Sequence, residues 1–119
     1  MLRLMCKSKI HGCIVTQKNI NYKGSIAIDR KLLQLSDIKP YEIVLVINVN
    51  TGIRFETYAI AAKYDSGIIS LQGGAARLGE IGDKLIIISY GFYSEAELNN
   101  YKPKIIIVDK ENRKIKIGK

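Results

Sequence analysis

Apolar and polar residues alternate along much of this chain, and a period of two is typical of β-strands with one buried face. Near the C-terminus, for example, Ile115 and Ile117 alternate with lysines. The pattern predicts extended segments at residues 2–7, 10–16, 41–48, 53–62, 67–71, 84–91, 104–108 and 113–117. Turn sequences separate several of them: Asn50-Thr51-Gly52, Asp65-Ser66-Gly67 and Asp109-Lys110-Glu111-Asn112.

Helical signals in the chain are short and depend on capping residues. Three segments are predicted: from the cap residue Asp29 to Leu35, from the capping box of Ser94 and Glu97 to a point before Pro103, and from Gly74 to Leu78. Helices of this length cannot cover a parallel sheet. The sequence therefore predicts a mainly β protein, and a small closed barrel removes the exposed strand edges that so many short strands would otherwise leave.

The composition fits one folded domain covering residues 1–119. Of the 119 residues, 47% are hydrophobic, which excludes a disordered chain. No apolar run approaches the ~20 residues that span a bilayer, so we expect a cytoplasmic protein without a membrane partner, whose Cys6 and Cys13 are reduced thiols. Two cysteines and one histidine, His11, are too few for a structural zinc site, and no metal is expected.

The formal charge of +8 is concentrated at the two ends of the chain. Residues 1–31 carry seven basic and one acidic side chain, residues 32–101 carry five and eight, and residues 102–119 carry seven and two. Basic ends can bind nucleic acid, but solvated surface is their more ordinary role. Because the middle is net acidic and has no aromatic stacking platform, we expect no nucleic-acid partner.

The Gly24–Ser25 bond is the strongest candidate in the sequence for a site of chemical reaction. Glycine adopts backbone angles closed to other residues and leaves its carbonyl open to the following hydroxyl, although an ordinary turn is the alternative. Attack by that hydroxyl gives an ester, β-elimination gives dehydroalanine, and hydrolysis gives a pyruvoyl group and ammonia. The chain would then consist of two pieces, residues 1–24 and residues 25–119.

The residues around this bond resemble the pyruvoyl-dependent aspartate 1-decarboxylases, bacterial enzymes that make β-alanine for pantothenate. The resemblance runs from Met1 to about Tyr93, and later residues match poorly. It is carried by Lys9-Ile10-His11, Tyr22-Lys23-Gly24-Ser25, Ala27-Ile28-Asp29, the block from Asn50 to Ala62, Gly73-Gly74-Ala75-Ala76 and Gly82-Asp83. The part Arg54-Phe55-Glu56-Thr57-Tyr58-Ala59-Ile60-Ala61 is the most specific.

The resemblance implies a fold, a reaction and an assembly. The fold is a six-stranded double-ψ β-barrel, and the assembly is a homotetramer. The reaction is decarboxylation of L-aspartate to β-alanine and CO₂ for pantothenate and coenzyme A biosynthesis. The cofactor is a covalent pyruvoyl group, made from Ser25 by self-cleavage, that forms a Schiff base with the substrate and accepts its electrons. Whether this cleavage is spontaneous or assisted by a maturation partner is left open by the sequence.

The resemblance also assigns roles to individual residues. Thr57 serves as donor to the oxyanion during cleavage, Tyr58 as proton donor in decarboxylation, and Lys9 and Arg54 as carboxylate ligands. Substrate contacts are also expected from Thr57 and from the backbone of Gly73, Gly74 and Ala75. Weaker candidates are His11, which can be a structural residue; Tyr22, which can simply pack; and Gln72. Gln72 and Gly74 stand where the family usually has Asn and Ala.

In a regular strand, the candidate site residues between Arg54 and Ala61 would lie on opposite faces of the sheet. Arg54, Glu56 and Tyr58 should face one side, whereas Phe55, Thr57 and Ala59 should face the other. We therefore expect a pocket between subunits. Two other hypotheses stay open: an uncleaved basic β-barrel that binds nucleic acid or another protein, and a pyruvoyl enzyme for another acidic amino acid such as glutamate.

Overall fold

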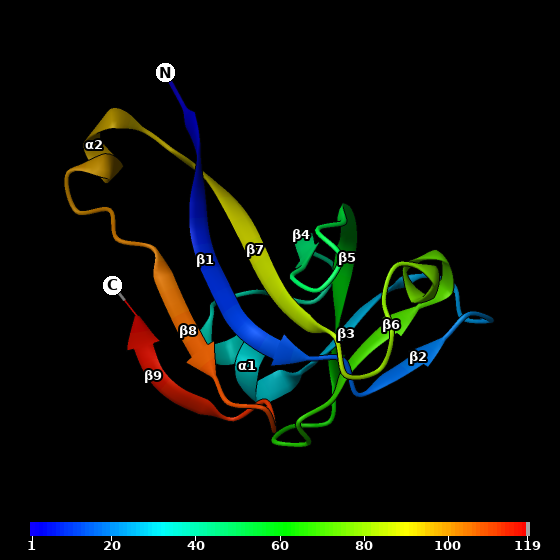
Figure 1. The fold of residues 1–119 in the computed structure, drawn as a ribbon. Helices are drawn as coiled ribbons and strands as arrows, with labels where there is room; N and C mark the ends of the chain where they lie inside the picture. Colours follow the sequence, from blue (N-terminus) through cyan, green and yellow to red (C-terminus); the bar gives the residue numbers. More distant parts are fainter. Residues whose placement is uncertain (119) are drawn as a thin grey trace.

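The computed structural model describes residues 1–118, with side chains described as far as Ile115. Strands dominate this part of the chain, together with three short helical segments (Figure 1). The strands are β1 (Arg3–Ile14), β2 (Gln17–Asn19), β3 (Ser25–Asp29), β4 (Ile43–Asn48), β5 (Arg54–Ala62), β6 (Ile69–Gln72), β7 (Lys84–Tyr93), β8 (Lys104–Val108) and β9 (Lys114–Gly118). The helical segments are α1 (Arg30–Leu35), η1 (Gly73–Arg77) and α2 (Glu95–Leu98).

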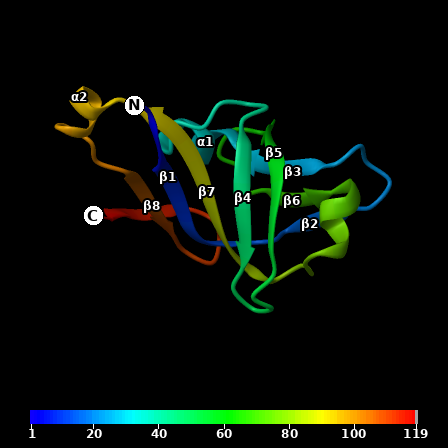
Figure 2. The same cartoon turned by 90° about the horizontal axis from the view of Figure 1, so that it is seen from above.

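The strands pair in the order β2-β6-β3-β5-β4-β7-β1-β8-β9. The pairs β1/β8, β2/β6 and β3/β5 are parallel, and the other neighbours are antiparallel. Seen from above, β4 and β5 lie between the group of β2, β3 and β6 and the group of β1, β7 and β8 (Figure 2). The prediction of a mainly β fold is confirmed. In residues 1–118 no pair joins the two ends of this order, so closure into a six-stranded double-ψ barrel stays a prediction.

Alternation along β4, β7 and β8 separates a buried inner face from an outer face. The inner positions Val44, Val46, Leu85 and Ile87 are fully buried, and Ile106 is nearly so. The positions between them are half-buried or exposed although they too are apolar: Ile43, Leu45, Ile47, Ile86, Ile88, Ile105 and Ile107. We call these seven residues the outer apolar face. The pattern therefore gives one core and leaves a second apolar surface on the same strands.

Most predicted strands are present, with three differences. The segments predicted at 2–7 and 10–16 form the single strand β1, whose pairing with β7 shifts register between Cys6 and Ser8 and between His11 and Cys13. The short strand β2 was missed because it has no apolar residue. β3 was missed because it is short: Ile26 and Ile28 alternate with Ser25, Ala27 and Asp29, but these five residues lie between a Gly-Ser turn signal and a helix cap. All five are buried, as expected for a strand covered on both faces.

The helical predictions depend on caps, and the caps are present. The Asp29 side chain accepts a hydrogen bond from the Lys31 N–H at the start of α1. Ser94 and Glu97 form the complete capping box of α2. The segment η1 begins at Gly73, one residue before the predicted turn. None of the helices between residues 1 and 118 has the length and apolar character needed to cross a membrane.

Candidate active site around Gly24 and Ser25

Ser25 is the first residue of β3, a strand that lies between β5 and β6 (Figure 1). It pairs with Gln72 at the end of the antiparallel strand β6. Ser25 is only 1% exposed, whereas Asn21, Tyr22 and Lys23 before it are exposed. The Gly24–Ser25 bond is therefore the point where a surface loop enters the interior of the sheet.

Both residues of this bond have a backbone conformation that L-amino acids rarely adopt. The φ angle is +108° at Gly24 and +106° at Ser25. Glycine has no Cβ and takes such an angle without penalty, but for serine it costs about 1–3 kcal/mol. The surrounding strands hold this conformation in place. Strain is thus stored on the bond that the sequence singles out for cleavage.

The Ser25 side chain is held by Gln72. Its Oγ donates a hydrogen bond to Gln72 Oε1 over 3.1 Å. An amide oxygen does not take up a proton at neutral pH, so this contact orients the hydroxyl and does not act as a base. From the sequence Gln72 is a weaker candidate, because its side chain is one methylene longer than the Asn that the resembling family usually has here. In the structure its amide nevertheless reaches the candidate nucleophile.

The glycine-rich segment after Gln72 lies against the same bond. Gly73 is buried and has a φ of +63°, and its Cα packs against the backbone of residues 22–24. Gly74 is exposed and open to solvent, while Ala75 is 8% exposed and belongs to the core. Of the two glycines, Gly73 is thus the one whose Cα side faces the backbone of Tyr22 and Gly24.

Thr57 and Tyr58 lie on β5, beside β3. Ile26 pairs with Ala59 in parallel register, which places Tyr58 level with Ser25 and Thr57 level with Gly24 along the two strands. The alternation prediction is confirmed for this strand. Phe55 packs against the core, Ala59 belongs to it, and Thr57 pairs with the core residue Val44. The alternate residues pair with three members of the outer apolar face: Arg54 with Ile47, Glu56 with Leu45, and Tyr58 with Ile43.

Lys9 and His11 lie on β1, on the same outer face as Arg54. Lys9 pairs with Ile88 and Ile105, and His11 pairs with Ile86 and Ile107, all four from the outer apolar face. Strands β7 and β4 separate β1 from β5, so the backbones of Lys9 and Arg54 are three strand spacings or more apart, ~14 Å. A single chain thus presents these two cations on one surface but does not bring them side by side.

A depression in the surface opens beside Tyr22 and Gln72. Its volume is about 410 Å³, and Tyr22, Ser70, Gln72 and Ile81 are among its lining residues. Tyr22 is 52% exposed and does not pack into the core. In residues 1–118 no group of three or more His, Cys, Asp or Glu side chains is arranged to hold a metal ion.

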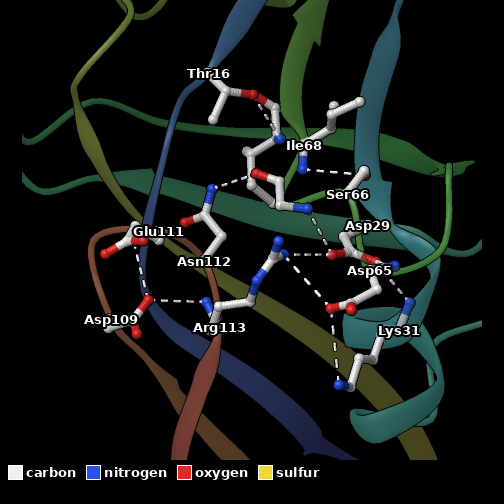
Figure 3. Close-up of polar contacts among 12 residues, drawn as sticks. Thr16, Asp29, Lys31, Asp65, Ser66, Ile68, Asp109, Glu111, Asn112 and Arg113 are labelled. Carbon is white, nitrogen blue, oxygen red and sulfur yellow. Dashed lines mark hydrogen bonds and ion pairs between the residues drawn. The ribbon is translucent and has the colours of Figure 1, made fainter.

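The far end of β3 is fixed by the carboxylate of Asp29, which is 1% exposed (Figure 3). It accepts hydrogen bonds from the backbone N–H groups of Lys31 at 2.9 Å, Asp65 at 2.8 Å and Gly67 at 2.9 Å. The Arg113 guanidinium lies 3.6 Å away. The sequence identified Asp29 only as a helix cap. In the structure it also ties β3 to the β5–β6 turn.

A second buried residue connects this anchor to the turn after β8. Asn112 has a φ of +62° and is 1% exposed. Its Oδ1 accepts from the Ile14 N–H, and its Nδ2 donates to the Ile14 carbonyl. The same Nδ2 also donates to the Gly67 carbonyl (Figure 3). The sequence showed only a turn here. The C-terminal hairpin is thus joined to the end of β1 and to the same turn that holds Asp29.

Comparison of the sequence with known proteins gives matches to one family. The family model described as aspartate decarboxylase matches residues 1–115. The aspartate 1-decarboxylase of Thermoanaerobacter pseudethanolicus is 53% identical over 115 residues, covering 97% of this chain and 98% of that protein. That of Kosmotoga olearia is 54% identical over 116 residues, covering 97% and 98%. That of Campylobacter jejuni is 52% identical over 113 residues, covering 95% and 89%. The limit expected near Tyr93 was wrong, because the family match continues through β8.

Proposed function

The chain belongs to the aspartate decarboxylase family, and on that premise we propose that it converts L-aspartate to β-alanine and CO₂ with a pyruvoyl group made from its own Ser25. The observation that carries the cofactor part is the strained backbone at Gly24 and Ser25, with φ of +108° and +106°. The proposed setting is the cytoplasm, where β-alanine would enter pantothenate and coenzyme A biosynthesis.

The proposed maturation needs only water as a further reactant. Ser25 Oγ attacks the Gly24 carbonyl carbon, a C–O bond forms, the C–N bond breaks, and the hydroxyl proton passes to the released amine. Loss of the Ser25 Cα proton then expels the Gly24 carboxylate and leaves dehydroalanine, whose hydrolysis releases ammonia. Thr57, level with Gly24 on the neighbouring strand, is the proposed donor to the developing oxyanion.

The site suits a group derived from Ser25, because this residue is buried and yet adjoins an exposed loop. When present, the pyruvoyl group supplies an electron sink for decarboxylation. Arg54 and Lys9 are the proposed ligands for the two carboxylates of the substrate. Tyr58 is the proposed proton donor, through its phenol hydroxyl. Backbone groups of Gly73, Gly74 and Ala75 complete the proposed substrate site, with His11, Tyr22, Thr57 and Gln72 around it.

We also propose that the site is completed by a second copy of the chain, within a homotetramer. The outer apolar face carries isoleucines that a monomer leaves in water, for example Ile43 at 55% exposure. Lys9 and Arg54 lie on this same face but are separated by two strands. Covering the face with a second copy would bury the isoleucines and bring the two cations to one pocket.

Subunit complementation tests this arrangement. Lys9→Ala and Ser25→Ala are each expected to be inactive alone. If a site combines Ser25 of one copy with Lys9 of another, random mixed assembly should restore about a quarter of the sites. Mixed oligomers should therefore show about a quarter of the parent turnover. Complete inactivity of verified mixed oligomers, or full activity of a dilute monomer, would contradict the shared site.

Denaturing mass spectrometry of the purified protein tests maturation. We expect fragments corresponding to residues 1–24 and 25–119, the second lighter by one ammonia than a serine-started peptide and reactive toward hydrazine. Ser25→Ala should abolish both fragments and β-alanine formation. Ser66→Ala is the matched control, since Ser66 lies in a surface turn beside Gly67 and should leave both unchanged. Aspartate turnover by a chain that stays intact would refute the proposal.

A further inference from the structure

Gly73 approaches the scissile segment more closely than any side chain would allow. A Cβ placed on it would lie 2.4 Å from Gly24 N, 2.6 Å from Gly24 Cα and 2.7 Å from the Tyr22 carbonyl oxygen. Contacts below 3.0 Å are essentially never made by real Cβ atoms. All three neighbours are backbone atoms, so rotation of a side chain cannot relieve the overlap.

The loop that enters the scissile bond has few other contacts. Asn21, Tyr22 and Lys23 are exposed. The loop's hydrogen bonds to Asn19 are one from the Asn21 N–H to Oδ1 at 3.0 Å and one from the Tyr22 N–H to the carbonyl at 3.4 Å. The backbone of Gly73 is therefore a close neighbour of Gly24 in addition to these local hydrogen bonds.

Two consecutive residues thus meet the two reacting groups. Gln72 holds Ser25 Oγ at 3.1 Å, and Gly73 lies against the backbone of Gly24, whose carbonyl must be attacked. Because both belong to the junction of β6 and η1, their relative position is fixed by the fold. The hydroxyl and the carbonyl are then presented to each other by one rigid segment.

We propose that Gly73 is a positioning residue for self-cleavage, whose bare Cα lets the backbone of residues 22–24 settle in the strained conformation that cleavage requires. This inference rests on the proposed function. A methyl group at position 73 would push residues 22–24 away by more than half an ångström. Misplacement of reacting groups by about 1 Å costs roughly 100-fold in rate, so we expect a loss of about that size.

The test compares Gly73→Ala with Gly74→Ala in the full chain. Gly74 is a control for an added methyl group in the cleavage step alone, which precedes any binding of substrate, because a Cβ there meets no atom within 4 Å and the family usually has Ala at this position. Intact and cleaved chains are quantified by mass spectrometry over time, with circular dichroism to check folding. We expect the first-order cleavage rate constant to fall about 100-fold for Gly73→Ala and to change less than about twofold for Gly74→Ala.

A second readout reports the local displacement without depending on chemistry. Both variants are repeated in the Ser25→Ala background, and tryptic cleavage after the exposed Lys23 is measured. The rate of tryptic cleavage after Lys23 should rise for Gly73→Ala and stay constant for Gly74→Ala. If the two variants have the same melting temperature, a general loss of stability cannot explain such a difference. Since the displaced loop lies on the surface, Gly73→Ala should fold, and a chain that does not fold contradicts the proposal.

The outcomes separate this inference from the one on which it rests. Normal cleavage of Gly73→Ala in a protein whose parent also cleaves would overturn the role of Gly73 alone. A parent chain that never cleaves would instead overturn the proposed maturation. Equal slowing of both glycine variants would also count against Gly73, because a Cβ added at position 74 meets no atom within 4 Å.

Discussion

Replacement of Asp29 should destabilise the fold more than replacement of its charged partner. Asp29→Ala removes the acceptor for three backbone N–H groups, of which that of Gly67 is buried. Hydrogen bonds to a charged group contribute about 1.5–3 kcal/mol each, but they are not additive within one cluster. We therefore expect the free energy of unfolding to fall by about 3–5 kcal/mol, a large part of the 5–15 kcal/mol typical of a domain.

Arg113→Ala provides the contrast within the same cluster. The Arg113 side chain is 44% exposed, and its nitrogen lies 3.6 Å from the Asp29 carboxylate, longer than a hydrogen bond. Asp29 is buried, but water screens the exposed guanidinium, and such pairs contribute about 0–1 kcal/mol. The three backbone N–H groups continue to donate to the carboxylate after the arginine is lost. We therefore expect Arg113→Ala to cost no more than about 1 kcal/mol.

Urea unfolding in the Ser25→Ala background measures both values. That background keeps the chain in one piece, and a fixed protein concentration removes differences due to assembly. Asp29→Asn keeps one oxygen acceptor and should lie between the other two variants. If Asp29→Ala unfolds within 1 kcal/mol of the parent, or if Arg113→Ala costs as much as Asp29→Ala, the assignment of the anchor to the backbone N–H groups is wrong.

Three further predictions concern separate parts of the molecule. Gln72→Leu removes a hydrogen bond of about 1 kcal/mol from Ser25 and should slow cleavage about fivefold in a mass-spectrometric time course; an unchanged rate would show that this bond does not orient the hydroxyl. Burial raises the pKa of Cys13 to about 12, so a maleimide at pH 8 should label at most one thiol until denaturant is added; rapid labelling of two in the folded protein would contradict this. Hydrogen bonds from the Asn48 amide and from a backbone N–H lower the pKa of Asp83, so its ionised form stabilises the fold above the ordinary carboxyl pKa, and this stabilisation is lost as pH falls through the folded-state pKa. Asp83→Asn should flatten the acid side of the curve of melting temperature against pH, and an unchanged curve would exclude this contribution.

Local signals in the sequence were sufficient for most of the fold. Alternation located the strands with one solvated or half-solvated face, and capping residues located α1 and α2, because both signals act between neighbouring residues. β3 escaped detection for a physical reason. It has only five residues, all buried between β5 and β6. Although Ile26 and Ile28 alternate with Ser25, Ala27 and Asp29, so short a run can equally be read as a turn followed by a helix cap.

The candidate site was predictable as a set of residues but not as an arrangement. The sequence showed that Gly24 precedes Ser25, but the φ of +106° at the serine depends on the strands that hold it. Likewise, from the sequence alone, a glycine at position 73 is compatible with a turn, with close approach of another backbone segment, or with no special role. Its significance appears only when the backbone of residues 22–24, about fifty positions earlier, is found at contact distance.

The distribution of charge and apolar surface on the sheet limits how a dianionic substrate can be bound. Strand alternation fixes Arg54 and Tyr58 on the outer side of β5, and the register of β1 fixes Lys9 on the same side. Rotation of a side chain does not move it to the other face of the sheet. A one-residue slip of the strand would do so, but it would also move the core residues of that strand into water. A pocket that uses both cations together with Ser25 therefore has to be closed by another surface. The outer apolar face, with the half-exposed isoleucines that separate those cations, is the surface a second copy of the chain would cover.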